Sequence, residues 1–220
     1  MTLHFQREVD KLKKMILNEA ALVESGLQKA LKALRERDEE LASEVKNSDN
    51  EVDMMEIEIE EEALKILALH QPVAIDLRFI VSVIKINNDL ERIGDLTSNI
   101  AARTTEIADF PHLQIPAHIT EMADIALTMV KESLDALVNL DVSLARKVCE
   151  DDEKVDELHR KTYKLTSEKV KEEPENITFF LKMLGISRYL ERIADHSTNI
   201  AEDVMYMVEG KISRHQKLDA

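Results

Sequence analysis

The sequence predicts an all-α protein with six long helices, arranged as two three-helix bundles in tandem. Three observations predict this fold. First, the 220 residues include only 4 Gly and 4 Pro, too few to form the many turns of a β-sandwich or barrel. Second, 44% of the residues are hydrophobic, enough to build a sizeable core. Third, the pattern of the first half recurs in the second half about 100 residues later.

The helices are expected at about residues 5–36, 39–70, 73–108, 116–139, 142–172 and 175–210. Asp38 and Asp141 each precede a helical run and can act as N-caps, because a short carboxylate accepts hydrogen bonds from free backbone N–H groups. Pro72 and Pro174 each stand where the next helix starts, a position that tolerates proline. Helices of this length are rods that pack into bundles when short loops join them.

The least helical stretch lies at the middle of the chain. It is FPHLQIP, residues 110–116, which contains Pro111 and Pro116. Since proline disfavours the interior of a helix, we expect the boundary between the two halves here. The chain is therefore divided into a first bundle, residues 1–110, and a second bundle, residues 111–220.

A polar motif repeats between the two halves. LERIGDLTSNIA, residues 90–101, and LERIADHSTNIA, residues 190–201, share 8 of 12 residues at an offset of 100. Upstream, an offset of 103 pairs Asp49 with Asp152 and Asp53 with Asp156. Helical periodicity alone repeats apolar positions but not polar ones, so the pattern indicates duplication of a three-helix unit. The period is too long for a solenoid repeat.

The charge of the chain limits what it can bind. With 29 Lys and Arg against 44 Asp and Glu, the net charge is −15, which repels the phosphate backbone of nucleic acids and disfavours a polybasic membrane anchor. No stretch approaches the ~18 apolar residues of a transmembrane helix. Cys149 is the single cysteine and has no disulfide partner within the chain. We therefore expect a cytoplasmic protein that binds no nucleic acid.

Four pairs of carboxylates, each spaced i and i+4, are the candidate site residues. They are Asp49 and Asp53, Glu91 and Asp95, Asp152 and Asp156, and Glu191 and Asp195. Each pair lies on one face of a helix, where like charges repel and a bound cation would turn that repulsion into chelation by oxygen ligands. On a helical wheel they fall away from the apolar stripe that contains Leu90 and Ile93. The sequence therefore predicts a metal site on the surface of each bundle.

Two readings of these carboxylates remain open. A charged helix face is often only a solvated surface, although duplication of all four spacings favours a site. Further ligands or supporting groups are proposed at Glu56, Asn99, His159, His196 and Asn199. If the site is catalytic, a metal-bound water would be the nucleophile and an enclosed pocket should lie near the carboxylates. An open helical surface would favour a binding protein, and we expect a mostly convex surface and no enzyme activity.

Two long segments resemble the signature of the PhoU family of phosphate-uptake regulators. They are QPVAIDLRFIVSVIKINNDLERIGDLTSNIA, residues 71–101, and LERIADHSTNIAEDVMYMVEG, residues 190–210. The chain departs from a symmetric pattern at Arg78, because the second half has Thr178 where the first has this arginine. The second half therefore has no arginine that could share a role with Arg78.

The resemblance implies two three-helix bundles related by a pseudo-twofold axis, with multinuclear iron or zinc held by the four carboxylate pairs. It also implies a negative regulator of phosphate uptake and of the phosphate-starvation response. Such a protein would be an adaptor between the ATPase of the phosphate ABC transporter and a phosphate-sensing histidine kinase. It would reach the inner face of the membrane through these protein partners only, and we expect a homodimer.

Overall fold

The computed structural model describes residues 3–211, which form six long α-helices and one short 3₁₀ turn. The helices are α1 (Leu3–Glu36), α2 (Glu39–His70), α3 (Ala74–Ile107), α4 (Ala117–Asn139), α5 (Val142–Glu172) and α6 (Ile177–Glu209), and the 3₁₀ turn η1 spans Pro174–Asn176. No strand occurs among these residues. The all-α fold is confirmed, and most helix ends lie within two residues of their predicted positions.

Matching turns join the first two helices of each half. The side chain of Asp38 accepts a hydrogen bond from the backbone N–H of Leu41, and that of Asp141 accepts from Ser143 and Leu144. Both predicted N-caps are therefore confirmed. Just before them, Arg37 and Leu140 adopt the left-handed conformation, with φ of 55° and 52°. This geometry ends one helix and turns the chain into the next.

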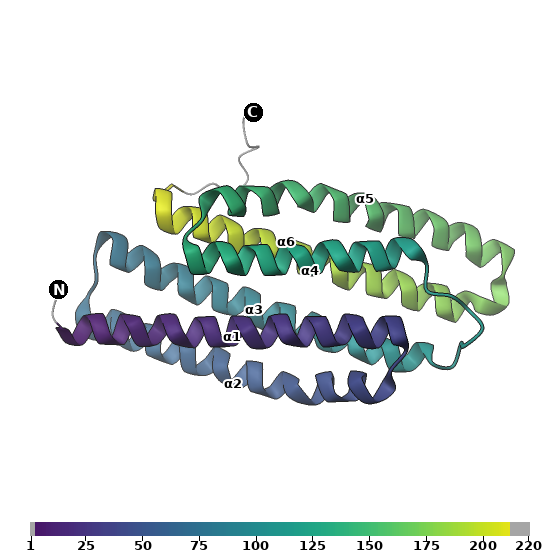
Figure 1. The fold of residues 1–220 in the computed structure, drawn as a ribbon, viewed down its shortest axis with the longest axis horizontal. Coiled ribbons are helices and arrows are strands. Elements are labelled where there is room, and N and C mark those ends of the chain that lie inside the picture. Colours follow the sequence, from purple (N-terminus) through teal and green to yellow (C-terminus); the bar gives the residue numbers. More distant parts are fainter. Residues whose placement is uncertain (1–2, 212–220) are drawn as a thin grey trace.

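The helices form two layers that lie along each other (Figure 1). Helix α3 packs against α1 and α2, and α6 packs against α4 and α5. The two bundles meet where α3 lies against α6 and α1 lies against α4. The six-helix, double-bundle architecture is therefore confirmed, whereas the division between residues 110 and 111 stays a prediction.

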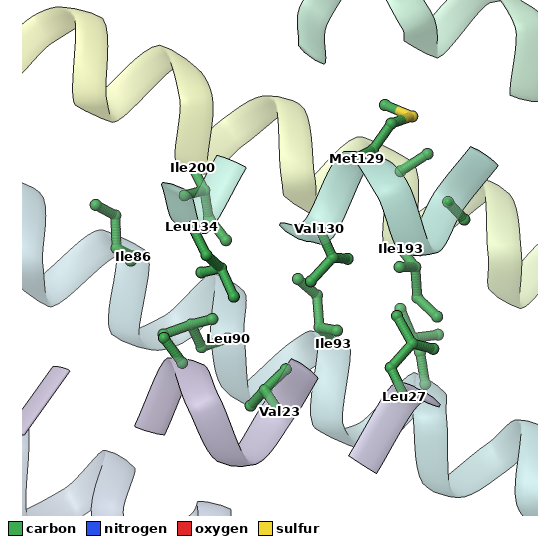
Figure 2. Packing of buried hydrophobic residues seen from close by; sticks show 14 of the residues in the cluster. Val23, Leu27, Ile86, Leu90, Ile93, Met129, Val130, Leu134, Ile193 and Ile200 are labelled. Carbon is green, nitrogen blue, oxygen red and sulfur yellow. The ribbon is translucent and has the colours of Figure 1, made fainter. Parts of the chain in front are cut away.

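The hydrophobic core runs through the contact between the bundles (Figure 2). Val23 of α1, Leu90 and Ile93 of α3, and Ile193 and Ile200 of α6 are almost fully buried. The apolar stripe predicted for residues 90–100 therefore faces the core. Removing such side chains from water is the main favourable contribution to folding, so the core that stabilises each bundle also joins the two.

The apolar stripe of α2 is buried at all but one of its positions. Val45, Val52, Ile59 and Ile66 are buried, but Met55 is only half-buried. Met55 lies toward the rim of the bundle, next to Glu56, where α2 faces solvent. The flexible side chain of methionine suits such an irregular position at the edge of a core.

Polar contacts also join the bundles across α3 and α6. Lys85 Nζ donates to Asp203 Oδ1 at 3.0 Å. Asp89 Oδ1 lies 2.7 Å from His196 Nδ1 and accepts a hydrogen bond of 3.1 Å from Asn199 Nδ2. Because Asp89 and Asp203 are both nearly buried, these partners satisfy charges that would otherwise be costly to remove from water.

The segment between the bundles is held by Arg37. Its guanidinium donates to the carbonyl oxygens of Ile107, Phe110 and Leu113, at 3.1 Å for Ile107 and 2.9 Å for Phe110. These carbonyls belong to the end of α3 and to the non-helical connection that follows it. The turn between α1 and α2 therefore fixes the connection that leads to α4.

Arg78 makes its own contact between the halves. A Cβ placed on Gly210 would lie 3.0 Å from Arg78 Nη1, so the guanidinium packs closely against the glycine that caps α6. Gly210 has φ of +70°, which glycine adopts without strain. Arg78 of the first bundle thus packs against the end of the last helix. Thr178, at the matching position of the second half, has no guanidinium to make such a contact.

Within residues 3–211, no helix is long and apolar enough to cross a membrane.

Candidate functional site

The carboxylates of the first half converge from α2 and α3. Asp49 and Asp53 lie on α2, and Glu91 and Asp95 lie on α3, which packs directly against it. Asp49 and Glu91 are half-buried, whereas Asp53 is exposed. We call these four residues the first carboxylate cluster.

The electrostatics of the first carboxylate cluster show that its members interact. Burial raises the pKa of the Asp49 carboxyl, a hydrogen bond with Ser98 opposes this, and the charges of Asp53 and Asp95 raise the pKa further. Burial also raises the pKa of Glu91, and the charge of Asp95 adds to the effect. Mutual repulsion between helices means that the cluster carries negative charge that a cation would relieve.

The second half repeats this arrangement on α5 and α6. Asp152 and Asp156 lie on α5, and Glu191 and Asp195 lie on α6; these four residues form the second carboxylate cluster. Burial raises the pKa of Asp152 to about 6, and the charges of Asp195, Asp156 and Glu191 add to it. Burial and the charges of Glu191 and Asp156 also raise the pKa of Asp195. Both predicted pairs in this half therefore face one another.

Arginines neutralise part of each cluster. Arg92 lies between two carboxylates of the first cluster, with Nε 3.2 Å from Glu91 Oε2 and Nη1 3.2 Å from Asp95 Oδ2. In the second cluster, Arg160 Nη1 lies 3.5 Å from Asp156 Oδ2. Because both arginines are well exposed, these ion pairs contribute little to stability and their side chains can move aside at low cost.

The five further candidates lie in different surroundings. Glu56 belongs with the first cluster, since burial and the charges of Glu60 and Asp53 raise its pKa. Asn99 lies exposed on α3. The other three contact different groups: His159 Nδ1 lies 3.0 Å from Ser187 Oγ, and both His196 and Asn199 contact Asp89. The structure therefore places His196 and Asn199 at the contact between the bundles.

The spacing of the carboxylates bears on which metal they fit. Within residues 3–211, one set of three His, Cys, Asp or Glu ligand atoms lies within 4.8 Å, and it is not part of either cluster. The cluster oxygens are thus more widely spread than the ligands of a single ion. Their donor set is all oxygen, which suits hard cations. The residues fit a metal by chemistry, and binding would require side-chain rotation or more than one ion.

The surface beside the clusters is hollowed, not mostly convex as predicted. Glu56 and Asp195 line a groove of about 750 Å³ between α2, α3 and α6. Glu191 and Asp195 line another, of about 710 Å³, between α5 and α6. The expectation of a convex surface is wrong, because α2, α3 and α6 leave one trough where the two bundles meet, and α5 and α6 leave another within the second bundle.

Sequence reasoning missed Glu19 of α1. It is fully buried, and neither carboxyl oxygen has a hydrogen-bond partner. Burial raises its pKa to about 9, and the charges of Glu56 and Glu91 contribute. A signal was present, because Glu19 lies on the apolar stripe of Leu12, Ile16, Val23 and Leu27, where a charged residue is out of place.

Gly94 sets the distance between α2 and α3 beside the first cluster. A Cβ there would lie 3.4 Å from Val52 Cγ1 and 3.7 Å from Asp49 Oδ1, which is close but ordinary contact. The second half has Ala194 at the equivalent position, fully buried. A small side chain is therefore required here in both bundles.

We expect Gly94→Ala to change the free energy of unfolding by less than about 1 kcal/mol, because the higher helix propensity of alanine offsets the tight contact. Gly94→Val should be destabilising by about 1–3 kcal/mol, since the larger side chain pushes against Val52. Urea unfolding of both variants checks this. Equal stability of the two would show that α2 and α3 are not closely packed at this position.

The fold and the site together define a tandem helical-bundle protein that presents duplicated acidic clusters, one on each bundle. The comparisons with known proteins name the family. Residues 16–104 and 119–204 both match the PhoU domain. The chain therefore belongs to the PhoU family.

Related proteins match over nearly the whole chain. A protein of Aquifex aeolicus, named a phosphate-specific transport system accessory protein PhoU homolog, is 38% identical over 96% of each chain. The crystal structure of PhoU from Pseudomonas aeruginosa superposes with a TM-score of 0.91 at 35% identity, covering 94% of this chain and 100% of that one. The crystal structure of the phosphate transport system regulatory protein PhoU from Streptococcus pneumoniae superposes with a TM-score of 0.84 at 29% identity. The match covers 94% of this chain and 98% of that one. The double-bundle fold is thus shared.

These relatives also decide between the two function classes. They are named accessory proteins of a transport system, not enzymes. The prediction that the chain is not an enzyme is confirmed, and the metal-dependent enzyme is not supported.

Proposed function

We propose that the protein restrains phosphate uptake and the phosphate-starvation response when phosphate is plentiful. It would do so as an adaptor that binds both the ATPase of the phosphate ABC transporter and a phosphate-sensing histidine kinase. The observation that carries the proposal is the membership of the PhoU family, whose relatives are named phosphate-specific transport system accessory proteins.

The acidic surface supports binding to other proteins. A net charge of −15 and two carboxylate clusters favour encounter with basic patches on a partner. This attraction is screened by salt, so complex formation should slow as ionic strength rises. The protein would act at the cytoplasmic face of the membrane through these partners and as a homodimer. Light scattering of the purified protein measures its oligomeric state.

Metal is proposed to adjust the charge of this surface. Asp49, Asp53, Glu91 and Asp95 would hold metal in the first bundle, with Glu56 beside them, and the second cluster would hold it in the other. Iron or zinc in a multinuclear arrangement suits oxygen ligands that are spread too widely for one ion. Bound cations would cancel several negative charges and so change which partner is attracted.

The test replaces four carboxylates, two in each cluster, with alanine: Glu91, Asp95, Glu191 and Asp195. In cells that lack the native protein, we expect this variant to fail to repress phosphate-starvation genes in rich phosphate. The helical content should not change, because all four positions lie outside the core. Metal content after purification without chelator should also fall.

A matched control removes the same charge elsewhere. It replaces four exposed acids outside the clusters with alanine: Glu58, Glu61, Glu121 and Asp135. We expect this control to repress normally. Full repression by the folded cluster variant would contradict a role for the carboxylates, and equal loss in both variants would show that only total charge matters.

A further inference from the structure

Two histidines and a glutamate converge at one end of the first bundle. Glu8 Oε2 lies 2.5 Å from His70 Nε2, and Glu8 Oε1 lies 3.5 Å from His4 Nε2. One ligand atom from each residue lies within 4.8 Å of the other two. Among residues 3–211, this is the set of three ligand atoms that is close enough for a single metal ion.

The helices bring these residues together because α1 and α2 run in opposite directions. His4 and Glu8 are spaced i and i+4 at the start of α1, so both lie on the same face. His70 is the last residue of α2, and Gln71 ends that helix in the left-handed conformation with its N–H bonded to Leu67 O. Three side chains from two helices thus meet at a fixed helix end, where the C-terminal dipole of α2 favours a cation.

The surroundings hold two of the three groups in place. Glu8 is only 8% exposed. The hydrogen bond with His70 lowers the pKa of Glu8. The ring of Phe5 packs edge-on against His70, with centroids 5.2 Å apart. His4 is more exposed, and its ring centroid lies 5.8 Å from that of His70. The site is thus largely preformed and open to solvent on one side.

We propose that His4, Glu8 and His70 form a binding site for a divalent transition metal, best suited to Zn²⁺, that joins the start of α1 to the end of α2. Two imidazole nitrogens and one carboxylate oxygen leave a fourth tetrahedral position for water, a common arrangement for zinc. Ligand atoms at zinc-bond lengths lie about 3.4 Å apart along a tetrahedral edge, from bond lengths of about 2.0–2.2 Å. The 3.5 Å between His4 and Glu8 already matches that spacing.

Loading the site requires two small changes. His70 Nε2 contacts Glu8 Oε2 at 2.5 Å, whereas His4 Nε2 faces Oε1, so the carboxylate must turn to present one oxygen to both histidines at about 3.4 Å. Lys65 Nζ, which lies 3.5 Å from Glu8 Oε1 and 3.4 Å from Glu62 Oε1, must shift toward Glu62. Lys65 is half-exposed, so this movement is easy.

The donor chemistry distinguishes this site from the two carboxylate clusters. Imidazole nitrogen prefers Zn²⁺, Co²⁺, Ni²⁺ and Cu²⁺, whereas carboxylate oxygens alone also accept Mg²⁺ and Ca²⁺. The proposed site should therefore bind Zn²⁺ even in the presence of excess Mg²⁺. At clusters built only of oxygen ligands, by contrast, the excess Mg²⁺ competes strongly with Zn²⁺.

The experiment titrates the purified full chain with Co²⁺ in excess Mg²⁺ and follows the visible spectrum. Tetrahedral Co²⁺ gives intense visible bands, whereas six-coordinate Co²⁺ bound by oxygen gives weak ones. We expect the intense bands to reach their full height at one equivalent of Co²⁺ per chain. They should disappear when added Zn²⁺ displaces the Co²⁺. His4→Ala should weaken binding at least tenfold, and since His4 is exposed, its loss should not affect folding. His112→Ala, an exposed histidine between the bundles, is the matched control and should leave the bands unchanged.

A second variant separates this site from the proposed function. The four-carboxylate alanine variant should keep the intense bands, because none of its substitutions touches the histidine site. His70→Ala should lose the bands, and circular dichroism shows whether that variant is folded. Absence of intense bands in the wild-type protein, or their persistence in His4→Ala, would overturn the proposal. Neither result would affect the role of the carboxylate clusters.

Discussion

Replacing Glu19 with glutamine is expected to stabilise the protein by about 3 kcal/mol at pH 7, the largest gain predicted for any single change here. Glu19 is fully buried with no hydrogen-bond partner for either carboxyl oxygen, and its pKa is raised from 4.5 to about 9. Burial is the first cause, and the charges of Glu56 and Glu91 follow. At neutral pH, the folded protein must therefore hold a proton on Glu19.

Proton binding by Glu19 explains why the stability of the wild-type protein falls as pH rises. Below about pH 4.5, Glu19 is protonated in both the folded and the unfolded chain, so it adds no pH dependence. Between pH 4.5 and about 9, the unfolded chain releases the proton and the folded chain keeps it, so stability falls as pH rises, by about 1.4 kcal/mol per unit. Glutamine resembles the protonated acid in shape and does not titrate, so it avoids this loss.

Urea unfolding between pH 4 and 9 measures the effect. We expect the wild-type protein and Glu19→Gln to be equally stable near pH 4 and to diverge as pH rises. Glu121→Gln, which changes an exposed glutamate of α4, should follow the wild-type curve throughout. Parallel curves for the wild-type protein and Glu19→Gln would mean that Glu19 has an ordinary pKa and that water or a cation reaches it.

Replacing Arg37 with alanine is expected to destabilise the protein by about 3 kcal/mol. The guanidinium donates to three backbone carbonyls of the α3 end and the connection after it, and hydrogen bonds from charged groups each contribute about 1.5–3 kcal/mol. The total is below three times that value because the carbonyls gain access to water when the arginine is removed. For a chain of this size, the melting temperature should fall by about 6–12 °C.

Backbone strain at the same position provides the control. Because Arg37 has φ of 55°, Arg37→Gly loses the same hydrogen bonds but relieves about 1 kcal/mol of left-handed strain. It should therefore be more stable than Arg37→Ala. Leu140 occupies the matching turn of the second half with φ of 52° and an exposed side chain, so Leu140→Gly should not destabilise the protein. If Arg37→Ala has the same melting temperature as the wild-type protein, the three hydrogen bonds do not hold the connection between α3 and α4.

The fold could be predicted because its main determinants are local in sequence. Helix length follows from scarce glycine and proline, helix starts follow from Asp38 and Asp141, and the burial of Leu90 and Ile93 follows from periodicity. The packing of α3 against α6 follows from no such pattern, because a stripe of apolar residues does not specify its partner. Hence neither the trough between α2, α3 and α6 nor the pairing of Asp89 with His196 follows from the sequence.

The sequence indicated which residues form the candidate site, but not how their side chains are arranged. The duplicated spacing identified both carboxylate clusters and the helices that carry them. It did not reveal that Arg92 lies between Glu91 and Asp95, because three side chains on one helix can take many rotamers. The His4, Glu8 and His70 group was also missed, since His70 is 62 residues from Glu8 and their contact depends on where two helices end.

Equivalent helices meet between the two bundles, α3 against α6 and α1 against α4, as they would in a homodimer, yet both halves belong to one chain. In a true homodimer, every substitution appears on both sides of the interface, so each change must suit its own copy. Tethering removes that restriction and also keeps the partner present at any protein concentration. Each half has since been free to change alone. Glu19 corresponds to Met122 at the offset of 103, and Gly94 corresponds to Ala194. Covalent linkage thus allows two halves of the same domain type to differ in titration behaviour within one molecule.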